Sequence, residues 1–499
     1  MFVDSIQPLI KHASTIRPRN GVITFGFVGG GDRISTTTQN YVRYIFKNMI
    51  EPFINVKFVE TGGEGDINFQ LHNNDAYYAY ESNHDVFLAR RHDNSSTDGG
   101  FQSGFGSHGF ETLLHETLHA LGLSHPGNYN GNDSGGTGPF LIYPADNNTN
   151  SVMTYNSAGE SAITPMPYDI AALQYLYGAS SLNAGSTYYQ FSSVYSFSDG
   201  TRTWGNGRDA SKLTIWDRGG TDTLDFSQLQ YESSGYRLDA RAGGILTTNR
   251  AFNTAAYRPR DAANPNADLQ KTSAFGTRLT YHTQIERVIG SQSSDTIFAG
   301  ASTQQIIGLG GDDRIEGSDR DDLIFGGTGS DLLTGGNGDD RLLGGDGGSI
   351  ENDLQGNDQL YGENGKDTLW GEGGNDRLFG GQHDDLLFGG SGDDQLRGTD
   401  SFSSSDRDQL FGGAGRDQFI LGSSQGSFYQ GSGYAIIKDW QAGLDRILLG
   451  RTSGSYSTQS QRLSGGSALD TAIYHNNDLI GVIEDSTNVS VERGDFAFV

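Results

Sequence analysis

A repeat of nine residues governs the C-terminal half of the chain. Two successive copies occupy residues 326–334 and 335–343, and each has Asp at position six and an apolar residue at position eight. The same register starts at Gly290 and extends to Gly412. A short fixed period is typical of architectures in which each repeat is one structural unit and successive units stack. The repeat therefore predicts a solenoid for this half of the chain.

Composition indicates what the solenoid binds. Residues 308–420 contain 25 Asp or Glu against 8 Lys or Arg, and the 499-residue chain has a formal net charge of −27. This acidic balance argues against nucleic acid or an anionic membrane as a partner and favours cations. The 73 glycines accompany only 10 prolines, which indicates ordered turns and not a flexible linker. Because the chain has no cysteine, His and carboxylate side chains must hold any metal.

The repeat resembles the calcium-binding nonapeptide of RTX proteins, and this resemblance implies a parallel β-roll. Its glycines allow tight turns that expose backbone carbonyls, and its Asp adds a carboxylate. A hard cation with roughly six to eight oxygen ligands can bridge such turns. The expected calcium ligands lie at the start of the repeat domain and in its repeat units: Asp217, Asp222, Asp295, Asp313, Asp322, Asp331, Asp340, Asp358, Asp367, Asp376, Asp385, Asp394, Asp408 and Asp417.

The apolar positions predict a narrow core inside the solenoid. The side chains expected to point inward are Leu332, Leu342, Leu360, Leu369, Leu378, Leu387 and Leu396. Two units lack the Asp, since Gln304 and Ser349 take its place, so calcium binding is in doubt there. Five extra residues, 401–405, interrupt a later unit. The alternative is a solvated acidic low-complexity segment, which the strict register disfavours.

The N-terminal half has the texture of a mixed α/β domain. Alternating apolar residues predict strands, and apolar residues three and four apart predict helices. Strands are expected at 23–27, 54–58, 67–71 and 86–88, and helices at 42–50, 110–121 and 167–177. Pro167 and Gly178 mark the two ends of the last helix, and Gly122 ends the one before it.

The helix at 110–121 has the pattern of a metal site. His115 and His119 are four residues apart, so both imidazoles lie on one helix face where one Zn²⁺ can accept them. Gly122 can adopt the left-handed conformation that turns the chain back and lets His125 complete a site of three nitrogens. Glu116 then points to the same rim of the metal. Such a site keeps one coordination position open for chemistry.

These residues, followed by Met153, resemble the metzincin metallopeptidases. Segments 125–130, 151–155, 166–178 and 215–227 are similar to serralysins, which are secreted bacterial zinc endopeptidases with a calcium-binding repeat domain. The resemblance implies the following roles: His115, His119 and His125 as zinc ligands, Glu116 as general base, Met153 in the turn beneath the metal and Tyr155 as a switchable extra ligand. Aromatic residues in turns also commonly just pack, so a packing role for Tyr155 remains open.

The expected architecture is an α/β metzincin catalytic domain at 1–195, followed by an all-β parallel β-roll at 196–499 with a β-rich cap and a secretion tail. We expect a zinc endopeptidase in which Glu116 assists the attack of a zinc-bound water on peptide bonds, and in which calcium drives the folding of the repeats after secretion. The alternative is a calcium-binding structural or adhesive surface protein with a vestigial protease domain.

The resemblance also implies a location and partners. No apolar run is long enough to span a membrane, and no signal peptide is visible at the start. Residues 495–499 resemble the acidic-then-apolar tail that serralysins present to type I secretion, although an ordinary terminal strand is the alternative. We expect an extracellular monomer that acts on proteins or peptides and uses the type I secretion machinery, with a proteinaceous inhibitor as a candidate partner.

Overall fold

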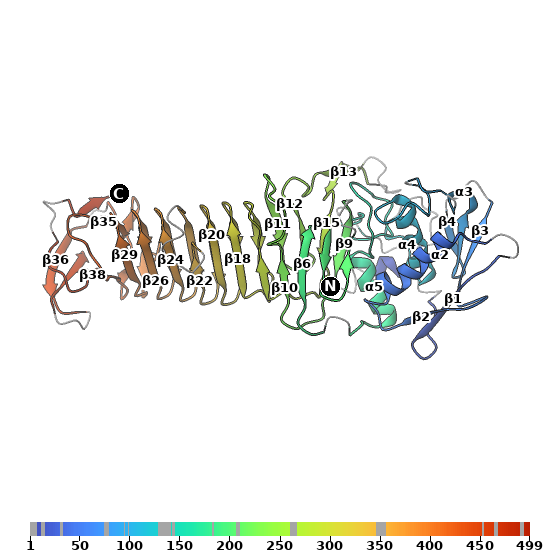
Figure 1. Ribbon diagram of the computed structural model, residues 1–499. Helices are drawn as coiled ribbons and strands as arrows, with labels where there is room; N and C mark the ends of the chain where they lie inside the picture. Colours follow the sequence, from blue (N-terminus) through green and yellow to red (C-terminus); the bar gives the residue numbers. More distant parts are fainter. Residues whose placement is uncertain are drawn as a thin grey trace. The chain divides into compact units, whose positions relative to one another are not determined.

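The computed structural model divides into two compact units (Figure 1). The first comprises Met1–Asp222 and Ala242–Gln284, and the second comprises Thr223–Arg241 and Ile285–Val499. The structure describes residues 7–10, 15–29, 33–73, 79–93, 95–97, 99–127, 141, 145–181, 184–205, 210–259, 267–345, 356–451, 454–463, 468–489 and 494–499. Ser349, which occupies a sixth position in the repeat, lies outside these residues.

These units do not coincide with the domain limits expected at residues 195 and 196. Strand β9 (Lys212–Ile215) pairs in parallel with β15 (Gly276–Leu279), and both belong to the first unit. The backbone N–H of Lys212 also donates to the Ser161 carbonyl at 3.1 Å. Segments beyond residue 195 therefore complete the first unit through backbone pairing.

One sheet of the first unit has the strand order β2-β1-β3-β5-β4. Its strands are β1 (Val22–Phe27), β2 (Lys57–Glu60), β3 (Ile67–His72), β4 (Ala79–Ser82) and β5 (Asp85–Ala89). The pairs β1–β2, β1–β3 and β3–β5 are parallel, whereas β4 runs antiparallel to β5 at one edge. Strand β2 begins later than residue 54, because Ile54 instead forms a bridge with Ala179.

The helical segments of the first unit are η1 (Gln7–Leu9), α2 (Thr36–Tyr44), η2 (Ile45–Ile50), α3 (Arg90–Asp93), α4 (His108–Ala120) and α5 (Pro167–Tyr177). Helix α4 contacts β4, β5 and α2, and its expected apolar face is fully buried. Helix α5 begins at Pro167 and has Gly178 as its C-cap, as predicted. None of the described helices has the length and apolarity needed to cross a membrane.

The remaining strands of the first unit are joined by further, mostly antiparallel, pairings. They are β6 (Tyr188–Ser193), β7 (Ser196–Ser198), β8 (Thr203–Trp204), β12 (Ile245–Thr248), β13 (Ala255–Tyr257) and β14 (Gln270–Thr272). The sequence β6–β7–β8 is an antiparallel meander, β12 pairs antiparallel with β15, and β13 and β14 pair antiparallel with each other.

The second unit is a parallel β-roll, as predicted, with successive strands stacked along its length (Figure 1). One ladder pairs, in order, β10 (Thr223–Asp225), β16 (Arg287–Ile289), β18 (Gln305–Gly310), β20 (Leu323–Thr328), β22 (Arg341–Leu343), β24 (Thr368–Gly373), β26 (Leu386–Ser391), β29 (Gln409–Ala414) and β34 (Ala435–Ile437). The other pairs β11 (Tyr236–Asp239), β17 (Thr296–Phe298), β19 (Arg314–Glu316), β21 (Leu332–Asn337), β23 (Gln359–Asn364), β25 (Arg377–Gln382), β27 (Gln395–Arg397), β30 (Gln418–Ile420) and β35 (Arg446–Leu449).

The eighth-position side chains form the predicted narrow core. Those at 342, 360, 369, 378, 387 and 396 are all 0% exposed. The expectation for Leu332 was wrong, because this residue occupies position seven and is only half-buried. Its neighbour Leu333 is 0% exposed and lies in the core. Side chains alternate between the two faces of a strand, so an error of one position exchanges inside for outside.

Two insertions change the spacing between turns without breaking the ladders. Most partners on neighbouring turns are 18 residues apart, as for Asp358 and Asp376. Asp331 and Asp358 are 27 residues apart, so the sequence distance between these paired turns exceeds the usual one by one repeat length. Asp385 and Asp408 are 23 residues apart, which accommodates the five-residue insertion predicted at 401–405.

The C-terminal part of the second unit caps the roll. Strands β36 (Tyr456–Gln461), β37 (Asp470–His475) and β38 (Asp478–Ile483) are antiparallel, and β38 pairs in parallel with β34. Strand β39 (Phe496–Phe498), within the expected secretion tail, pairs in parallel with β35. The short strands here and nearby are β28 (Ser403–Ser404), β31 (Gly422–Ser423), β32 (Gly426–Ser427) and β33 (Gln430–Gly431).

Candidate metal centre

Helix α4 positions the first two histidines. Its N-cap is Ser107, whose side chain accepts the Phe110 N–H. At the other end, Gly122 has φ of 94° and donates its N–H to the His119 carbonyl. The Leu123 N–H returns to the Leu118 carbonyl at 3.1 Å. This pair of hydrogen bonds is a Schellman motif, which needs the left-handed glycine and reverses the chain directly after the helix.

The reversal brings His125 to the two helical histidines. Its Nε2 lies 3.1 Å from the Nε2 of His115 and 3.0 Å from the Nε2 of His119. Nitrogens bound tetrahedrally to one Zn²⁺ are about 3.4 Å apart, given metal–nitrogen bonds of about 2.1 Å. Among the described residues, these three histidines form the one cluster of His, Asp or Glu whose potential ligand atoms all lie within 4.8 Å. The donor set fits a zinc ion.

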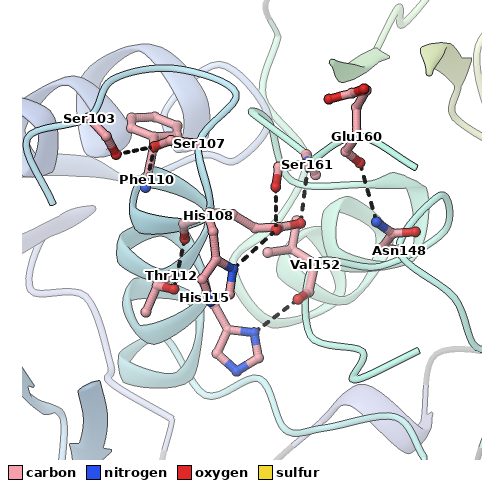
Figure 2. Close-up of polar contacts among 12 residues, drawn as sticks. Ser103, Ser107, His108, Phe110, Thr112, His115, Asn148, Val152, Glu160 and Ser161 are labelled. Atoms are coloured by element: carbon pink, nitrogen blue, oxygen red, sulfur yellow. Dashed lines mark hydrogen bonds and ion pairs between the residues drawn. The ribbon is translucent and has the colours of Figure 1, made fainter. Parts of the chain in front are cut away.

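Backbone carbonyls fix the tautomers of the helical histidines. The Nδ1 of His115 is 2.9 Å from the Val152 carbonyl, and the Nδ1 of His119 is 2.8 Å from the Leu123 carbonyl. Figure 2 shows the contact between His115 and Val152. A carbonyl accepts only, so each Nδ1 carries the proton and each Nε2 presents a lone pair. Burial lowers the pKa of His115, which also favours the neutral ring.

Glu116 lies beside these nitrogens with little contact to water. Its side chain is 7% exposed, and its Oε2 accepts no hydrogen bond from the described residues. Burial raises the pKa of this carboxyl to about 8, and the charge of Glu81 adds to the rise. A carboxyl with such a pKa can gain and lose a proton near neutrality.

Tyr155 and Met153 lie in the turn that the sequence indicated. The ring centroid of Tyr155 is 4.3 Å from that of His125 and 6.2 Å from that of His115. Met153 is 0% exposed, and its N–H donates to Ser151 Oγ at 3.0 Å. Tyr155 therefore borders the histidine cluster, a position compatible both with coordination and with packing.

Asp169, which was not among the predicted site residues, supports the same turn. Its carboxylate accepts hydrogen bonds from Ser151 Oγ at 2.6 Å and from the N–H groups of Val152 at 2.7 Å and Met166 at 2.9 Å. The side chain is 0% exposed, and burial raises its pKa to about 6. Because the Val152 carbonyl orients His115, Asp169 acts on a potential ligand through the backbone.

A cleft of 590 Å³ opens beside these residues. Its walls include Glu116, His115 and Tyr155, and also Val152 and Thr154 from the segment 151–155 that the sequence indicated. The other lining residues were marked by no sequence motif: Ala79, His108, Glu111, Thr112, Asn156, Ser157, Ser161, Tyr257 and Arg258. Glu111 accepts hydrogen bonds from Ser161 Oγ at 2.8 Å and from the Ala162 N–H at 3.1 Å. Tyr257 and Arg258 come from a segment more than a hundred residues downstream of the helix, so spacing offered no signal for them.

A buried lysine lies behind one wall of the cleft. The Nζ of Lys212 donates to Asn148 Oδ1 at 2.7 Å and to the Ala158 carbonyl at 2.6 Å. Burial lowers the pKa of this amine to about 7, although the charges of Glu111 and Glu160 oppose the change. The lysine ties β9 to the loop that carries these acceptors.

In the second unit, the sixth-position aspartates align in two files. One file runs through Asp295, Asp313, Asp331, Asp358, Asp376, Asp394 and Asp417, and the other through Asp322, Asp340, Asp367, Asp385 and Asp408. Within each file, every Asp donates its backbone N–H to Oδ1 of the next. The first file continues to Asp445, which the nine-residue register did not indicate.

The second carboxylate oxygen stays open at several positions of the files. Oδ2 accepts no hydrogen bond from the described residues at Asp313, Asp340, Asp367, Asp385, Asp394 and Asp417. A Cβ built on Gly308 would lie 2.2 Å from Asp313 Oδ2 and 2.3 Å from the Gly326 carbonyl. Glycine at position one therefore leaves room where a carboxylate and a carbonyl oxygen converge, which is the donor chemistry that calcium prefers.

Without a bound cation, burial and mutual repulsion of the carboxylates raise the free energy of the aspartate files. Burial and neighbouring aspartates raise the pKa of Asp313 to about 10 and that of Asp385 to about 10. Burial, partly offset by a backbone hydrogen bond, raises the pKa of Asp367 to about 6. Stacked carboxylates thus favour either protonation or a bound positive charge.

At five of the expected calcium ligands, carboxylate oxygens accept hydrogen bonds from groups outside the files. Asp322 accepts from the Ser318 N–H at 2.6 Å. Asp217 accepts from Tyr189 Oη at 2.6 Å and Asp222 from the Thr187 N–H at 2.6 Å, and both lie in the first unit, outside the files. Asp295 accepts from the Ser291 and Tyr236 N–H groups. Asp408 accepts from Tyr429 Oη at 2.5 Å.

Comparison with known proteins identifies the repeat. The family of RTX calcium-binding nonapeptide repeats (four copies) matches residues 284–315, 316–350, 353–387, 361–396 and 402–424. These residues coincide with most of the stacked turns of the second unit, so the chain carries RTX repeats in a β-roll, as the sequence predicted.

The chain is also similar to bacterial metalloproteases. It is 35% identical over 200 residues to metalloprotease AprA of Pseudomonas entomophila (strain L48), covering 34% of this chain and 40% of that protein. It is 36% identical over 150 residues to serralysin C of Dickeya chrysanthemi, covering 28% and 30%. Serralysin B of the same organism is 30% identical over 239 residues, covering 45% and 43%. The chain thus spans less than half the length of these relatives, which are of the kind that the sequence resembles.

Proposed function

We propose that this protein is a secreted zinc endopeptidase whose RTX repeats bind calcium. The observation that carries the proposal is the convergence of three imidazole Nε2 atoms, two with tautomers set by backbone carbonyls, beside a buried glutamate in an open cleft. The similarity to serralysins and to metalloprotease AprA supports the same reaction class.

His115, His119 and His125 would hold the zinc ion through their Nε2 atoms, with Met153 packed in the turn nearby. When bound there, the ion would supply Lewis acidity to water and to a peptide carbonyl. Three neutral donors leave most of the positive charge on such an ion, which is what peptide hydrolysis requires. The hydrogen bonds to Val152 and Leu123 hold two of the rings in place beforehand.

Glu116 would move the proton. Its unpartnered Oε2 would accept a proton from the attacking water and deliver it to the leaving amide nitrogen. The raised pKa suits both steps, because the carboxyl must be deprotonated before the attack and protonated afterwards. Tyr155 would donate a hydrogen bond from its phenol to the oxyanion that develops at the carbonyl oxygen.

An extended polypeptide is the substrate form that the cleft suits. Strand β4 lies at the edge of its sheet, and Ala79 from this strand lines the cleft. An edge strand can pair with an added extended chain through backbone hydrogen bonds. The substrate would therefore be held by its backbone across the metal centre, as expected for cleavage within proteins.

The aspartate files would bind calcium after export. Open Oδ2 atoms and converging carbonyls supply the ligands, and neutralisation of the files would allow the roll to fold. The tail at 495–499 would address the chain to type I secretion while its strand also pairs with β35. Deletion of these five residues should leave the protein inside the producing cell. Unimpaired secretion would contradict their role as a secretion signal.

The decisive experiment is casein digestion by the full chain and by Glu116→Ala, each with a zinc chelator and a calcium chelator in separate reactions. We expect one Zn²⁺ per chain in both proteins and a loss of activity of about three orders of magnitude in the variant. Wild-type protein without zinc or without proteolysis would contradict the proposal and favour a calcium-binding structural or adhesive role.

A further inference from the structure

A cationic side chain on the wall of the cleft bears on substrate choice. Tyr257 and Arg258 line the same 590 Å³ cleft as His115 and Glu116. They lie at the end of β13, in the hairpin that β13 forms with β14. This hairpin belongs to the first unit, although it follows that unit's α4 by more than a hundred residues.

The hairpin is attached to the cleft wall at several points. Thr272 Oγ1 donates to Asn147 Oδ1 at 3.3 Å, and it also contacts Thr149 Oγ1. The Glu160 N–H donates to the Ala274 carbonyl at 2.7 Å. Each contact joins the hairpin region to the segment that carries the cleft-lining residues 152–161. Arg258 thus follows a strand whose paired neighbour, β14, is held to the cleft wall.

The side chain of Arg258 retains most of its hydrogen-bonding capacity. It is exposed, and its Nη1 donates to the Ala267 carbonyl at 2.9 Å. No carboxylate of the described residues lies within ion-pair distance of this guanidinium, in contrast to Arg43, which pairs with Glu60 at 2.7 Å. A guanidinium has five N–H donors, so four remain for a ligand.

Glu111, one of the two acidic residues in the lining, is already engaged by hydrogen bonds. Glu111 accepts from Ser161 and Ala162, so its carboxylate is committed within the wall. Figure 2 shows the hydrogen bond that Ser161 donates to this carboxylate as a dashed line. In a chain of net charge −27, an arginine in the cleft that pairs with no carboxylate of the described residues supplies a local positive potential.

From this geometry we propose that Arg258 forms an anionic subsite, which selects peptide segments with an Asp or Glu side chain near the scissile bond. The inference rests on the proposed endopeptidase function and names its substrate class. The planar guanidinium can bind a carboxylate through two parallel hydrogen bonds, which an amide side chain of the same shape cannot match.

Pairs of quenched-fluorescence peptides test the proposal. Within each pair the sequence is identical except for Glu or Gln at one position, and each position from the fourth before to the fourth after the scissile bond is examined. We expect wild-type protein to prefer Glu at one position by about five- to tenfold in kcat/KM, with the preference falling as salt is added. In Arg258→Ala the ratio should approach one because only the Glu peptide loses rate.

Two further variants give the matched comparison. Arg258→Lys should keep part of the preference, since it preserves the charge but loses the bidentate geometry. Lys271→Ala removes an exposed charge from the opposite strand of the same hairpin, outside the cleft lining, and should keep the wild-type ratio. A preference that Lys271→Ala loses equally would overturn the assignment to Arg258.

The failures of the two proposals are distinguishable. If wild-type protein cleaves the peptides but shows no Glu preference at any position, the anionic subsite is wrong and the endopeptidase function stands. If Arg258→Ala slows the Glu and Gln peptides equally, Arg258 has only a structural role, which also overturns the inference. If zinc-loaded wild-type protein cleaves neither casein nor any peptide, the proposed function itself fails.

Discussion

The histidine cluster and the aspartate files assemble their donor atoms by opposite means. His115 and His119 are neutral rings, each oriented by a hydrogen bond to a backbone carbonyl. The files instead repeat a carboxylate on each turn, and the backbone satisfies one oxygen while the other faces its neighbours, as at Asp367 and Asp385. Neutral donors can be held together by the protein alone, whereas stacked anions repel one another.

Because of this difference, we expect removal of zinc and removal of calcium to affect the protein in different ways. Loss of zinc from a preformed site of neutral ligands should abolish chemistry and leave most of the fold. Loss of calcium from the files should cost the fold itself, because inward leucines form only a thin core against backbone entropy and carboxylate repulsion. The comparison predicts that zinc is coupled to activity and calcium to folding.

The largest expected effect is the response of the second unit to calcium removal. A calcium chelator should unfold the repeats within 285–499, while residues of the first unit keep their protection. Hydrogen exchange resolved by peptide, together with circular dichroism, measures both regions at once. Unchanged hydrogen exchange in the repeats after chelation would show that the files need no cation to fold. The expected difference between the roles of calcium and zinc would then be wrong.

Tyr155→Phe sharpens the zinc side of the comparison. Loss of one oxyanion donor typically costs about 10²–10³ in kcat, whereas three histidines should suffice to retain the metal. We therefore expect zinc content and KM close to those of wild type, and kcat lower by about two orders of magnitude. Near wild-type kcat would mean that Tyr155 only packs in its turn.

Asp367→Asn compares an open file position with an exposed one. Oδ2 of Asp367 is unpartnered in its file, so its loss should raise the calcium concentration at the midpoint of folding by about tenfold. Asp339→Asn removes the same charge from an exposed neighbour whose Oδ1 accepts the Lys366 N–H, and should change the midpoint less than about twofold. Equal shifts would indicate that total charge matters and position does not.

The smallest effect concerns the buried lysine of the first unit. Lys212 has a folded-state pKa of about 7, below the usual 10.5, so between these values the unfolded chain holds a proton that the folded chain lacks. The contribution of Lys212 to stability should therefore rise with pH across this window, by at most about 1.4 kcal/mol per pH unit, and be flat below it. Lys212 buries its Nζ among Asn148 and Ala158, with Glu111 and Glu160 as the charges that face it.

Unfolding of Lys212→Met and of Lys271→Met, each followed from pH 6 to 11 at constant calcium, isolates this contribution. The slope should be lower than that of wild type in Lys212→Met, by at most about 1.4 kcal/mol per pH unit, and should equal the wild-type slope in Lys271→Met, whose replaced lysine is exposed. A slope that is unchanged in Lys212→Met would assign the pH dependence to other groups.

Local sequence patterns predicted much of the fold. The spacing of His115, His119, Gly122 and His125 predicted one helix, its end and the cluster, because an α-helix fixes which residues share a face and a glycine marks where it stops. The nine-residue period likewise predicted stacked strands and inward leucines. The error at Leu332 arose from a shift of one position, to which a two-residue alternation is fully sensitive.

Other features lay beyond any local pattern. Nothing near residue 169 indicates that its carboxylate holds the backbone of Val152 and so acts on His115. The 27-residue spacing between Asp331 and Asp358 was also missed, because a sequence register cannot show which turns pair with each other.

The sequence by itself determined the two metal chemistries of this protein: three histidines with a glutamate on one helix turn, and one carboxylate for each short repeat. Both follow from residue type and short spacing, which act within a single helix or turn. Only the tertiary structure decided that β9 and the hairpin at β13 and β14 complete the first unit, that Arg258 lines its cleft, and that one oxygen of several aspartates stays open. These features depend on contacts between segments that are distant in the sequence. Such contacts follow no short repeating pattern of residue types, so the sequence alone does not indicate them.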